Sequence, residues 1–78
     1  MDKKVVMYTT PTCHFCHLAK DFFKTNNVAF EEYDVAVDQA KAREMVEKSG
    51  QMGVPVIMID DQIIVGFDES GIRSALGL

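Results

Sequence analysis

The stretch TTPTCHFCH, residues 9–17, holds both cysteines of this 78-residue chain, spaced as Cys13-x-x-Cys16. A short apolar run, residues 5–8, precedes it, and a helical pattern of apolar residues begins within it at Phe15. The motif therefore lies at a predicted strand-to-helix junction. Unpaired N–H groups at a helix start stabilise a thiolate on the first cysteine, and the second is close enough to close a small disulfide ring. In a cytosolic chain with a strand–helix pattern, this spacing indicates a dithiol redox site.

Length and composition limit the functions that the chain can have. Its 78 residues, 47% of them apolar, are enough for one folded domain, which we expect to span 1–78. The net charge of −4 leaves no surplus of Lys and Arg to neutralise phosphates, so nucleic acid is not an expected partner. No apolar segment approaches membrane-spanning length, and the first apolar run is too short for a signal peptide. We therefore expect a cytoplasmic protein that does not contact membranes.

Apolar periodicity and turn residues predict the element order β-α-β-α-β-β-α. The first strand is almost continuously apolar, which indicates a central strand, whereas the second alternates, which indicates an edge strand or one with a solvated face. Asp38 and Asp68 are typical N-cap residues for the second and third helices. The predicted strands are 4–8, 28–35, 56–59 and 62–65, and the predicted helices are 14–26, about 38–48 and a short last one after Asp68.

The order of these elements predicts the fold class. A right-handed crossover makes the first two strands parallel, and the hairpin 56–65 must then join the central strand in antiparallel fashion. We expect an α/β fold with a four-stranded mixed sheet flanked by three helices, which cover both faces.

The two cysteines have different predicted roles. Disulfide exchange needs a thiolate, and a helix start favours the thiolate of Cys13 more than that of Cys16 inside the helix. Cys13 would attack a substrate disulfide to form a mixed disulfide, which Cys16 would resolve. A bridge across two residues removes little unfolded-state entropy, so its use would be chemical. The alternative is two ordinary buried cysteines, which pack as small apolar residues.

Two histidines and a phenylalanine surround these thiols. His14 and His17 add two metal-binding side chains, but neighbouring residues of one helical turn cannot surround zinc tetrahedrally, so we predict no metal site. A cationic His14 would stabilise a neighbouring thiolate, and His17 is expected to face solvent. Phe15 is either the first core residue of the helix or an exposed aromatic side chain beside the thiols. Pro55 cannot donate a hydrogen bond to a strand, so it marks an edge, a first strand residue or a bulge.

Three motifs, in this order along the chain, resemble the glutaredoxin branch of the thioredoxin-fold superfamily. They are Tyr8-Thr9-x-x-x-Cys13-x-x-Cys16, Ser49-Gly50-Gln51-x-x-Val54-Pro55 and Gly66-x-Asp68. The resemblance covers nearly the whole chain. It implies the thioredoxin/glutaredoxin fold and a thiol–disulfide oxidoreductase that reduces protein disulfides or glutathione mixed disulfides.

The resemblance implies a role for each matching position. Cys13 would attack, Cys16 would resolve, and Pro55 would be a cis-proline facing the disulfide. The backbone of Val54 would pair with the cysteinyl unit of glutathione or with a substrate strand, and Asp68 would hold the γ-glutamyl end at a helix start. The predicted substrate-binding residues are accordingly His14, Phe15, Val54, Pro55, Phe67 and Asp68.

Several positions depart from the usual glutaredoxin pattern. His14-Phe15 replaces Pro-Tyr, Thr10 replaces a lysine that helps to bind glutathione, and Gly53 replaces the Thr of Thr-Val-Pro. Gly66-Phe67 resembles instead the glutaredoxin-like hydrogen donors of ribonucleotide reductase, which take electrons from thioredoxin reductase. We therefore expect glutathione or thioredoxin reductase as the electron source and no tightly bound cofactor. The expected partners are protein disulfides, with ribonucleotide reductase as a candidate, and the protein is expected to be a monomer.

Two other classes of function use the same residues. The cysteines could bind a metal ion or hold an iron–sulfur cluster between two chains, or the chain could be an interaction domain with an inert dithiol. Copper carriers favour a methionine two residues before the first cysteine, where this chain has Pro11, and a different element order. Visible absorption after anaerobic purification would identify a cluster, and a failed disulfide-reduction assay would favour the interaction domain.

Overall fold

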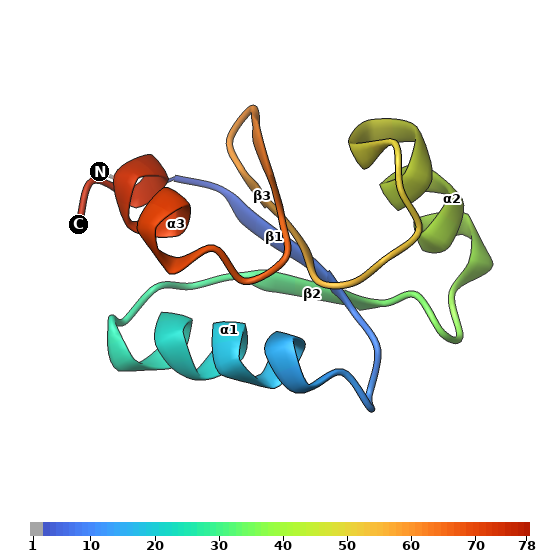
Figure 1. The fold of residues 1–78 in the computed structure, drawn as a ribbon, viewed down its shortest axis with the longest axis horizontal. Helices are drawn as coiled ribbons and strands as arrows, with labels where there is room; N and C mark the ends of the chain where they lie inside the picture. Colours follow the sequence, from blue (N-terminus) through green and yellow to red (C-terminus); the bar gives the residue numbers. More distant parts are fainter. Residues whose placement is uncertain (1–2) are drawn as a thin grey trace.

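The computed structural model describes residues 3–78, and its elements follow the predicted order β-α-β-α-β-β-α (Figure 1). The strands are β1 (Val5–Thr9), β2 (Glu31–Asp34), β3 (Val56–Ile59) and β4 (Gln62–Val65). The helices are α1 (His14–Thr25), α2 (Gln39–Ser49) and α3 (Glu69–Leu76). Over residues 3–78, no helix has the length and apolar character that a membrane crossing requires.

The strands form one mixed sheet in the order β2-β1-β3-β4. β1 pairs with β2 in parallel and with β3 antiparallel, and β3 and β4 form the hairpin. The predicted sheet, with a central first strand and an edge position for the second, is thereby confirmed. All five residues of β1 are buried, as a central strand covered on both faces requires.

The helices cover the two faces of the sheet unequally. α1 and α3 pack on one face, where Ala19, Phe23, Ile72 and Ala75 meet alternate residues of β1 and β3. α2 packs on the other face, where its one buried residue, Met45, joins Val6, Tyr8 and Val56 (Figure 1). The alternation along β1 explains this division, because successive side chains of a strand point to opposite faces.

The second strand is shorter than the sequence predicts. It begins at Glu31, not at Val28, because the Val28 N–H bonds back to the last turn of α1, which ends at Thr25. The Val28 N–H donates to the Phe23 carbonyl at 2.8 Å, and Asn27 takes a positive φ of 56°. Val28 and Phe30 pack against the core on the α1 face without joining the sheet.

Capping residues mark the starts of α2 and α3 and the end of α2, as the sequence predicts. The Asp38 carboxylate accepts the Lys41 N–H at 3.0 Å, and the Asp68 carboxylate accepts the Gly71 N–H at 3.1 Å. Gly50 follows α2 with a φ of 75°, a left-handed conformation that favours glycine. Both predicted N-caps are therefore confirmed.

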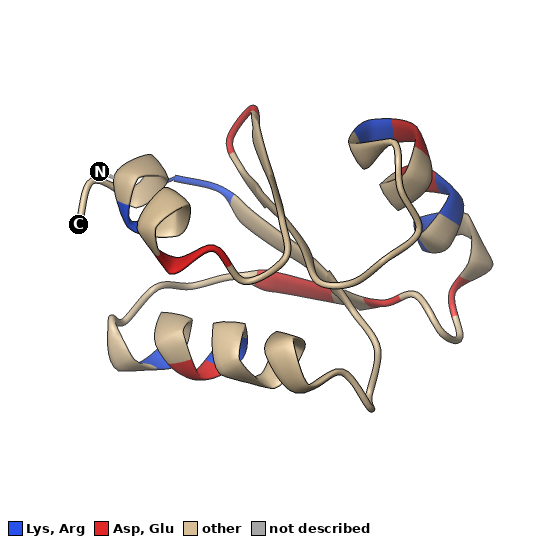
Figure 2. Cartoon of the chain, viewed as in Figure 1, with Lys and Arg blue, Asp and Glu red and all other residues tan. Residues whose placement is uncertain are grey.

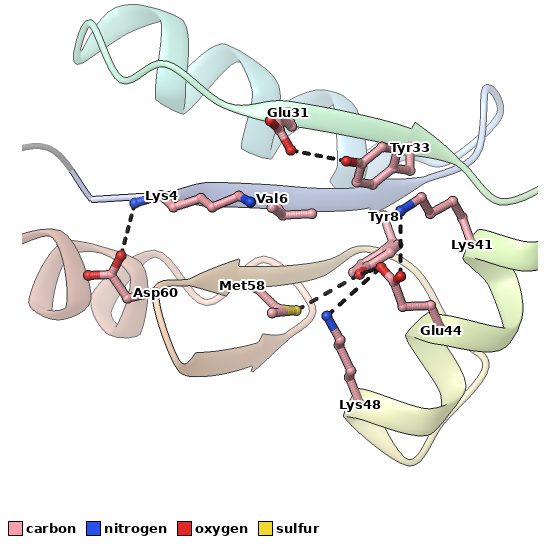
Figure 3. Close-up of a pocket in the computed structure, with 10 residues that line it drawn as sticks. All are labelled: Lys4, Val6, Tyr8, Glu31, Tyr33, Lys41, Glu44, Lys48, Met58 and Asp60. Carbon is pink, nitrogen blue, oxygen red and sulfur yellow. Dashed lines mark hydrogen bonds and ion pairs between the residues drawn. The ribbon is translucent and has the colours of Figure 1, made fainter.

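A polar pocket of about 240 Å³ lies between α2 and the sheet (Figure 3). In it the Tyr8 hydroxyl donates to the Glu44 carboxylate, and Lys41 and Lys48 approach the same carboxylate at 3.4 and 3.9 Å. Lys41 also lies 4.1 Å from the centre of the Tyr33 ring. Burial, followed by the bond to Glu44, raises the pKa of Tyr8. This cluster fixes α2 on the sheet, and the chain that leaves α2 leads directly to Pro55.

Candidate dithiol active site

Three segments that are distant in sequence meet at one end of the sheet. The chain leaves β1 there toward Cys13, enters β3 there from Pro55, and leaves β4 there toward Asp68. Tyr8 pairs with Val56 across β1 and β3, and the Gly66 N–H donates to the Pro55 carbonyl at 2.8 Å. The sheet register therefore brings the predicted cysteine, proline and aspartate segments to the same edge.

Cys13 is the N-cap residue of α1. Its backbone is extended (φ −86°, ψ 113°), and its sulfur accepts the Cys16 N–H at 3.1 Å. The Cys13 side chain is half-buried and reduced. A helix-start donor thus points at the sulfur that would carry negative charge during attack, as the sequence predicts.

Cys16 lies one turn further along α1 and is completely buried. Burial, followed by the hydrogen bond to Cys13, raises the pKa of Cys16 to about 12, while a backbone hydrogen bond with Thr10 and the charge of Lys20 act in the opposite direction. Cys16 is therefore a neutral thiol at rest. The two cysteines differ in access, in the sense that an attacking and a resolving thiol require.

The residues between and beside the cysteines face outward. Phe15 is 57% exposed, which settles the sequence alternative in favour of a surface aromatic side chain. The His14 ring is exposed and meets the Phe15 ring edge-on at 5.5 Å between centroids. His17 is exposed as predicted, with a ring nitrogen 3.0 Å from the Pro11 carbonyl, so it also braces the loop that precedes the cysteines.

Pro55 immediately precedes β3, and the Val54–Pro55 peptide bond is cis, as the family resemblance implies. The Pro55 side chain is fully buried, and Val54 is partly buried against the cluster on the α2 face. The sequence allowed an edge, a first strand residue or a bulge for this proline, whereas the structure places it one residue before β3. The Pro55 carbonyl accepts the Gly66 N–H, and this hydrogen bond joins the proline segment to the end of β4.

Phe67 and Asp68 have structural contacts besides any role in a groove. The Phe67 ring lies 6.0 Å from the Phe22 ring of α1, edge-on, and is partly buried against the core. Asp68 is exposed and caps α3. Gly71 has to be small here, because a Cβ at this position would lie 2.7 Å from Asp68 Oδ2.

A partly exposed ion pair between α1 and β2 was missed by the sequence prediction. Lys20 Nζ lies 2.7 Å from Glu32 Oε2, and the Thr9 hydroxyl donates to the same oxygen at 2.8 Å. Lys20, by its hydrogen bond, is the main cause of a lowered pKa of Glu32. The spacing of Cys16 and Lys20, four residues apart on one helix, could have indicated the lysine. Glu32 depends on the register of β2 beside β1, which no local pattern gives.

Few formal charges lie on the segments that carry the dithiol, although Asp68 and Lys20 follow them directly. The segments that meet there carry no Lys, Arg, Asp or Glu over residues 9–19, 49–59 and 62–67. Figure 2 shows the resulting uncoloured first turn of α1 and the loop before it. Besides Phe15, the exposed apolar side chains on these segments include Met52, at 80% exposure. The site therefore offers aromatic and apolar contacts more than ion pairs.

Comparison with known proteins agrees with the geometry. The glutaredoxin family model matches residues 5–64. The chain belongs to the glutaredoxin family. As a glutaredoxin, it is a thiol–disulfide oxidoreductase, and the resemblance stated from the sequence motifs is confirmed.

Individual relatives cover most of this glutaredoxin. It is 44% identical over 68 residues to an uncharacterised glutaredoxin-like 8.6 kDa protein in the rubredoxin operon of Clostridium pasteurianum, which covers 87% of this chain and 91% of that protein. It is 42% identical over 65 residues to glutaredoxin 3 of Escherichia coli, covering 83% and 78% respectively. A crystal structure of a thioredoxin-like protein superposes with a TM-score of 0.90 at 32% identity and covers 95% of both chains. The predicted thioredoxin/glutaredoxin fold is thus confirmed.

Proposed function

We propose that this glutaredoxin reduces protein disulfides, or mixed disulfides of glutathione, through Cys13 and Cys16. The observation that carries the proposal is the asymmetry of the pair. The Cys13 sulfur is half-buried at the start of α1 with a backbone donor at 3.1 Å, and the Cys16 sulfur is fully buried one turn behind it. A substrate sulfur can reach the first thiol but not the second.

The proposed reaction has two steps. The Cys13 thiolate attacks one sulfur of the substrate disulfide, which forms a Cys13–substrate bond and releases the other sulfur with the electron pair of the broken bond. Cys16 then loses its proton and attacks the Cys13 sulfur, and the remaining substrate sulfur leaves as a thiolate that takes up a proton. The protein ends as a Cys13–Cys16 disulfide, oxidised by the two electrons that the substrate gains.

The substrate groove is proposed to run between the segments that meet at the sheet end. The backbone of Val54, beside cis-Pro55, would pair with an extended substrate or with the cysteinyl unit of glutathione. Phe15 and His14 would contact the substrate from the exposed first turn of α1. Phe67 and Asp68 would form the opposite wall, with Asp68 and the start of α3 near the γ-glutamyl end.

The absence of a lysine at position 10 bears on the choice of electron donor. Thr10 stands where a lysine would pair with a glutathione carboxylate, so the groove offers glutathione fewer charged contacts than most glutaredoxins do. Oxidised protein should therefore be incubated either with glutathione and glutathione reductase or with thioredoxin reductase, while NADPH oxidation is followed. The donor that sustains turnover is the proposed electron source. We propose cytoplasmic action as a monomer without a tightly bound cofactor, and ribonucleotide reductase as one protein substrate to assay.

The role of each cysteine is tested by substitution. Cys13→Ser should abolish reduction of insulin and of glutathione mixed disulfides. Cys16→Ser should abolish insulin reduction and accumulate a mixed disulfide on Cys13, detected by mass spectrometry. Equal residual activity in both variants would contradict the proposed roles.

A further inference from the structure

A hydrogen-bonded cluster lies between α1 and the sheet and takes no part in the steps above. Glu32 Oε2 accepts the Thr9 hydroxyl at 2.8 Å and lies 2.7 Å from Lys20 Nζ. Thr9 is 2% exposed, and the side chains of Lys20 and Glu32 are 20% and 35% exposed. The lysine is therefore held in one place by a carboxylate that is itself anchored to the end of β1.

The lysine of this cluster lies about one helical turn from the resolving cysteine. Lys20 follows Cys16 by four residues on α1, so the two side chains leave the helix on the same face, one turn apart. The neighbouring residues Thr9 and Thr10 bond to Glu32 and to Cys16 respectively, which brings both groups to the same end of β1. The charged groups around Cys16 are thus Cys13 and Lys20, and those around Glu32 are Lys20 and His17.

The resolving step requires deprotonation of Cys16, which a nearby positive charge such as that of Lys20 favours. Cys16 is fully buried, and a buried thiol resists the loss of its proton because the thiolate is poorly solvated there. A fixed positive charge one turn away offsets part of that cost, and Lys20 acts on Cys16 in this direction. Residues 9–19, which surround Cys16 in the sequence, contain no other Lys or Arg that could supply this positive charge.

We propose that Lys20 is a positioning residue for the resolving step: held by Glu32 and Thr9, it keeps a positive charge on the Cys16 side of α1 while the Cys16 sulfur is deprotonated and attacks the mixed disulfide. The inference rests on the proposed dithiol function. It assigns to Lys20 no proton transfer and no contact with substrate. The lysine remains protonated, the Cys16 proton passes to solvent, and the leaving substrate sulfur takes a proton from solvent.

The two thiol reactions can be measured separately in one experiment. Reduced protein is mixed rapidly with dithiobis(nitrobenzoate), a symmetric aromatic disulfide. Attack by Cys13 releases one coloured thiolate, and resolution by Cys16 releases the second. The rates of both phases are recorded against pH for the wild type, Lys20→Gln and Lys20→Arg. Lys24→Gln is the matched control, because Lys24 is an exposed lysine of the same helix.

Lys20→Gln should slow the second phase about fivefold at neutral pH, equal to a rise of about 0.7 in the apparent pKa of resolution, and leave the first phase within about twofold of wild type. Lys20→Arg should restore the second phase to within about twofold, because it keeps the charge. Lys24→Gln should behave as wild type. An unaltered first phase also shows that the substitution leaves the reactivity of Cys13 unchanged.

Three results would contradict the inference, and one of them would also contradict the proposed function. If Lys20→Gln slows the second phase no more than Lys24→Gln does, Lys20 has no such role and the dithiol mechanism stands. If wild-type protein shows no second phase, Cys16 does not resolve the mixed disulfide, and the proposed function fails together with the inference. A pH profile of the second phase that is the same in wild type and Lys20→Gln would count against it even if the rate falls.

Discussion

The Tyr8 hydroxyl donates a hydrogen bond to the Glu44 carboxylate and so joins the central strand to α2 across 36 residues of chain. Tyr8 is 1% exposed, and only Thr9 separates it from the loop that leads to the dithiol. α2 in turn leads to the Pro55 segment. The bond therefore holds two parts of the active site through the face of the sheet opposite α1.

Tyr8→Phe should lower the free energy of unfolding by about 1 kcal/mol, because it removes the buried hydroxyl and leaves the shape of the ring. Urea denaturation followed by circular dichroism measures the change. Tyr33→Phe is the control, since its hydroxyl bonds to Glu31 at 3.0 Å on the exposed side of the same pocket. The Tyr33 variant should lose less stability, and an equal loss in the two variants would contradict the role of the Tyr8–Glu44 bond.

Stability should fall as the solution becomes acidic. The pKa of Glu32 is lowered mainly by its bond to Lys20, and that of Glu44 mainly by its bond to Tyr8. A carboxylate with a lower pKa in the folded state stabilises the fold above its unfolded pKa of about 4.3, and this stabilisation is lost as pH falls through the folded value. Urea midpoints measured from neutral pH downward should show this loss.

Glu32→Gln and Glu44→Gln should each flatten the acid limb of that profile, because the amide does not titrate. Glu47→Gln, at an exposed position on α2, provides the control. An acid limb that is as steep in the two variants as in the control would show that other carboxylates cause the acid sensitivity.

Asp68→Ala and Asp38→Ala remove equivalent helix caps, at 3.1 and 3.0 Å from their N–H donors. Each should cost about 1 kcal/mol of unfolding free energy. Only Asp68 lies at the dithiol end of β4, so only Asp68→Ala should also raise the KM for a glutathione mixed disulfide. The same KM in both variants would remove Asp68 from the proposed groove and leave it as a cap.

Phe15→Ala should change recognition and not folding. Phe15 is 57% exposed, so its removal should leave the urea midpoint nearly unchanged while the KM for a protein disulfide rises about threefold or more. Leu78→Ala is a matched surface control at 55% exposure. Phe23→Ala, at a fully buried position, should by contrast cost about 3–5 kcal/mol of unfolding free energy. A Phe15 variant with unaltered KM would show that the aromatic ring does not contact the substrate.

Much of the fold could be predicted because local chemistry marks it. The apolar runs of the hairpin give its strand bounds at 56–59 and 62–65, and Asp38 and Asp68 mark helix starts through their own backbone bonds. The strand expected from Val28 failed for a local reason as well. A helix ending with a left-handed Asn27 keeps the Val28 N–H for the helix, and the alternation of apolar residues does not reveal this.

The candidate site, like the fold, could be predicted only in part from the sequence. Cys13 and Cys16 are visible as a motif, and their unequal burial follows from the helix that contains them. The Lys20–Glu32 pair could not be predicted, because it needs the register that sets Glu32 beside Met7 across two strands. The sequence also could not decide whether Phe15 is buried or exposed, because a residue in the first turn of a helix can face either the core or the solvent.

The hairpin has its turn far from the chemistry. Tyr8 pairs with Val56 near the dithiol, and Val5 pairs with Ile59 at the other end of the same strands, where the Asp60 N–H bonds to the Lys4 carbonyl at 2.8 Å. The turn at 60–61 is thus separated from the thiols by the length of the sheet. A short epitope or a fluorescent reporter inserted at that turn would travel with the enzyme and leave its electron-transfer end free to meet its partners.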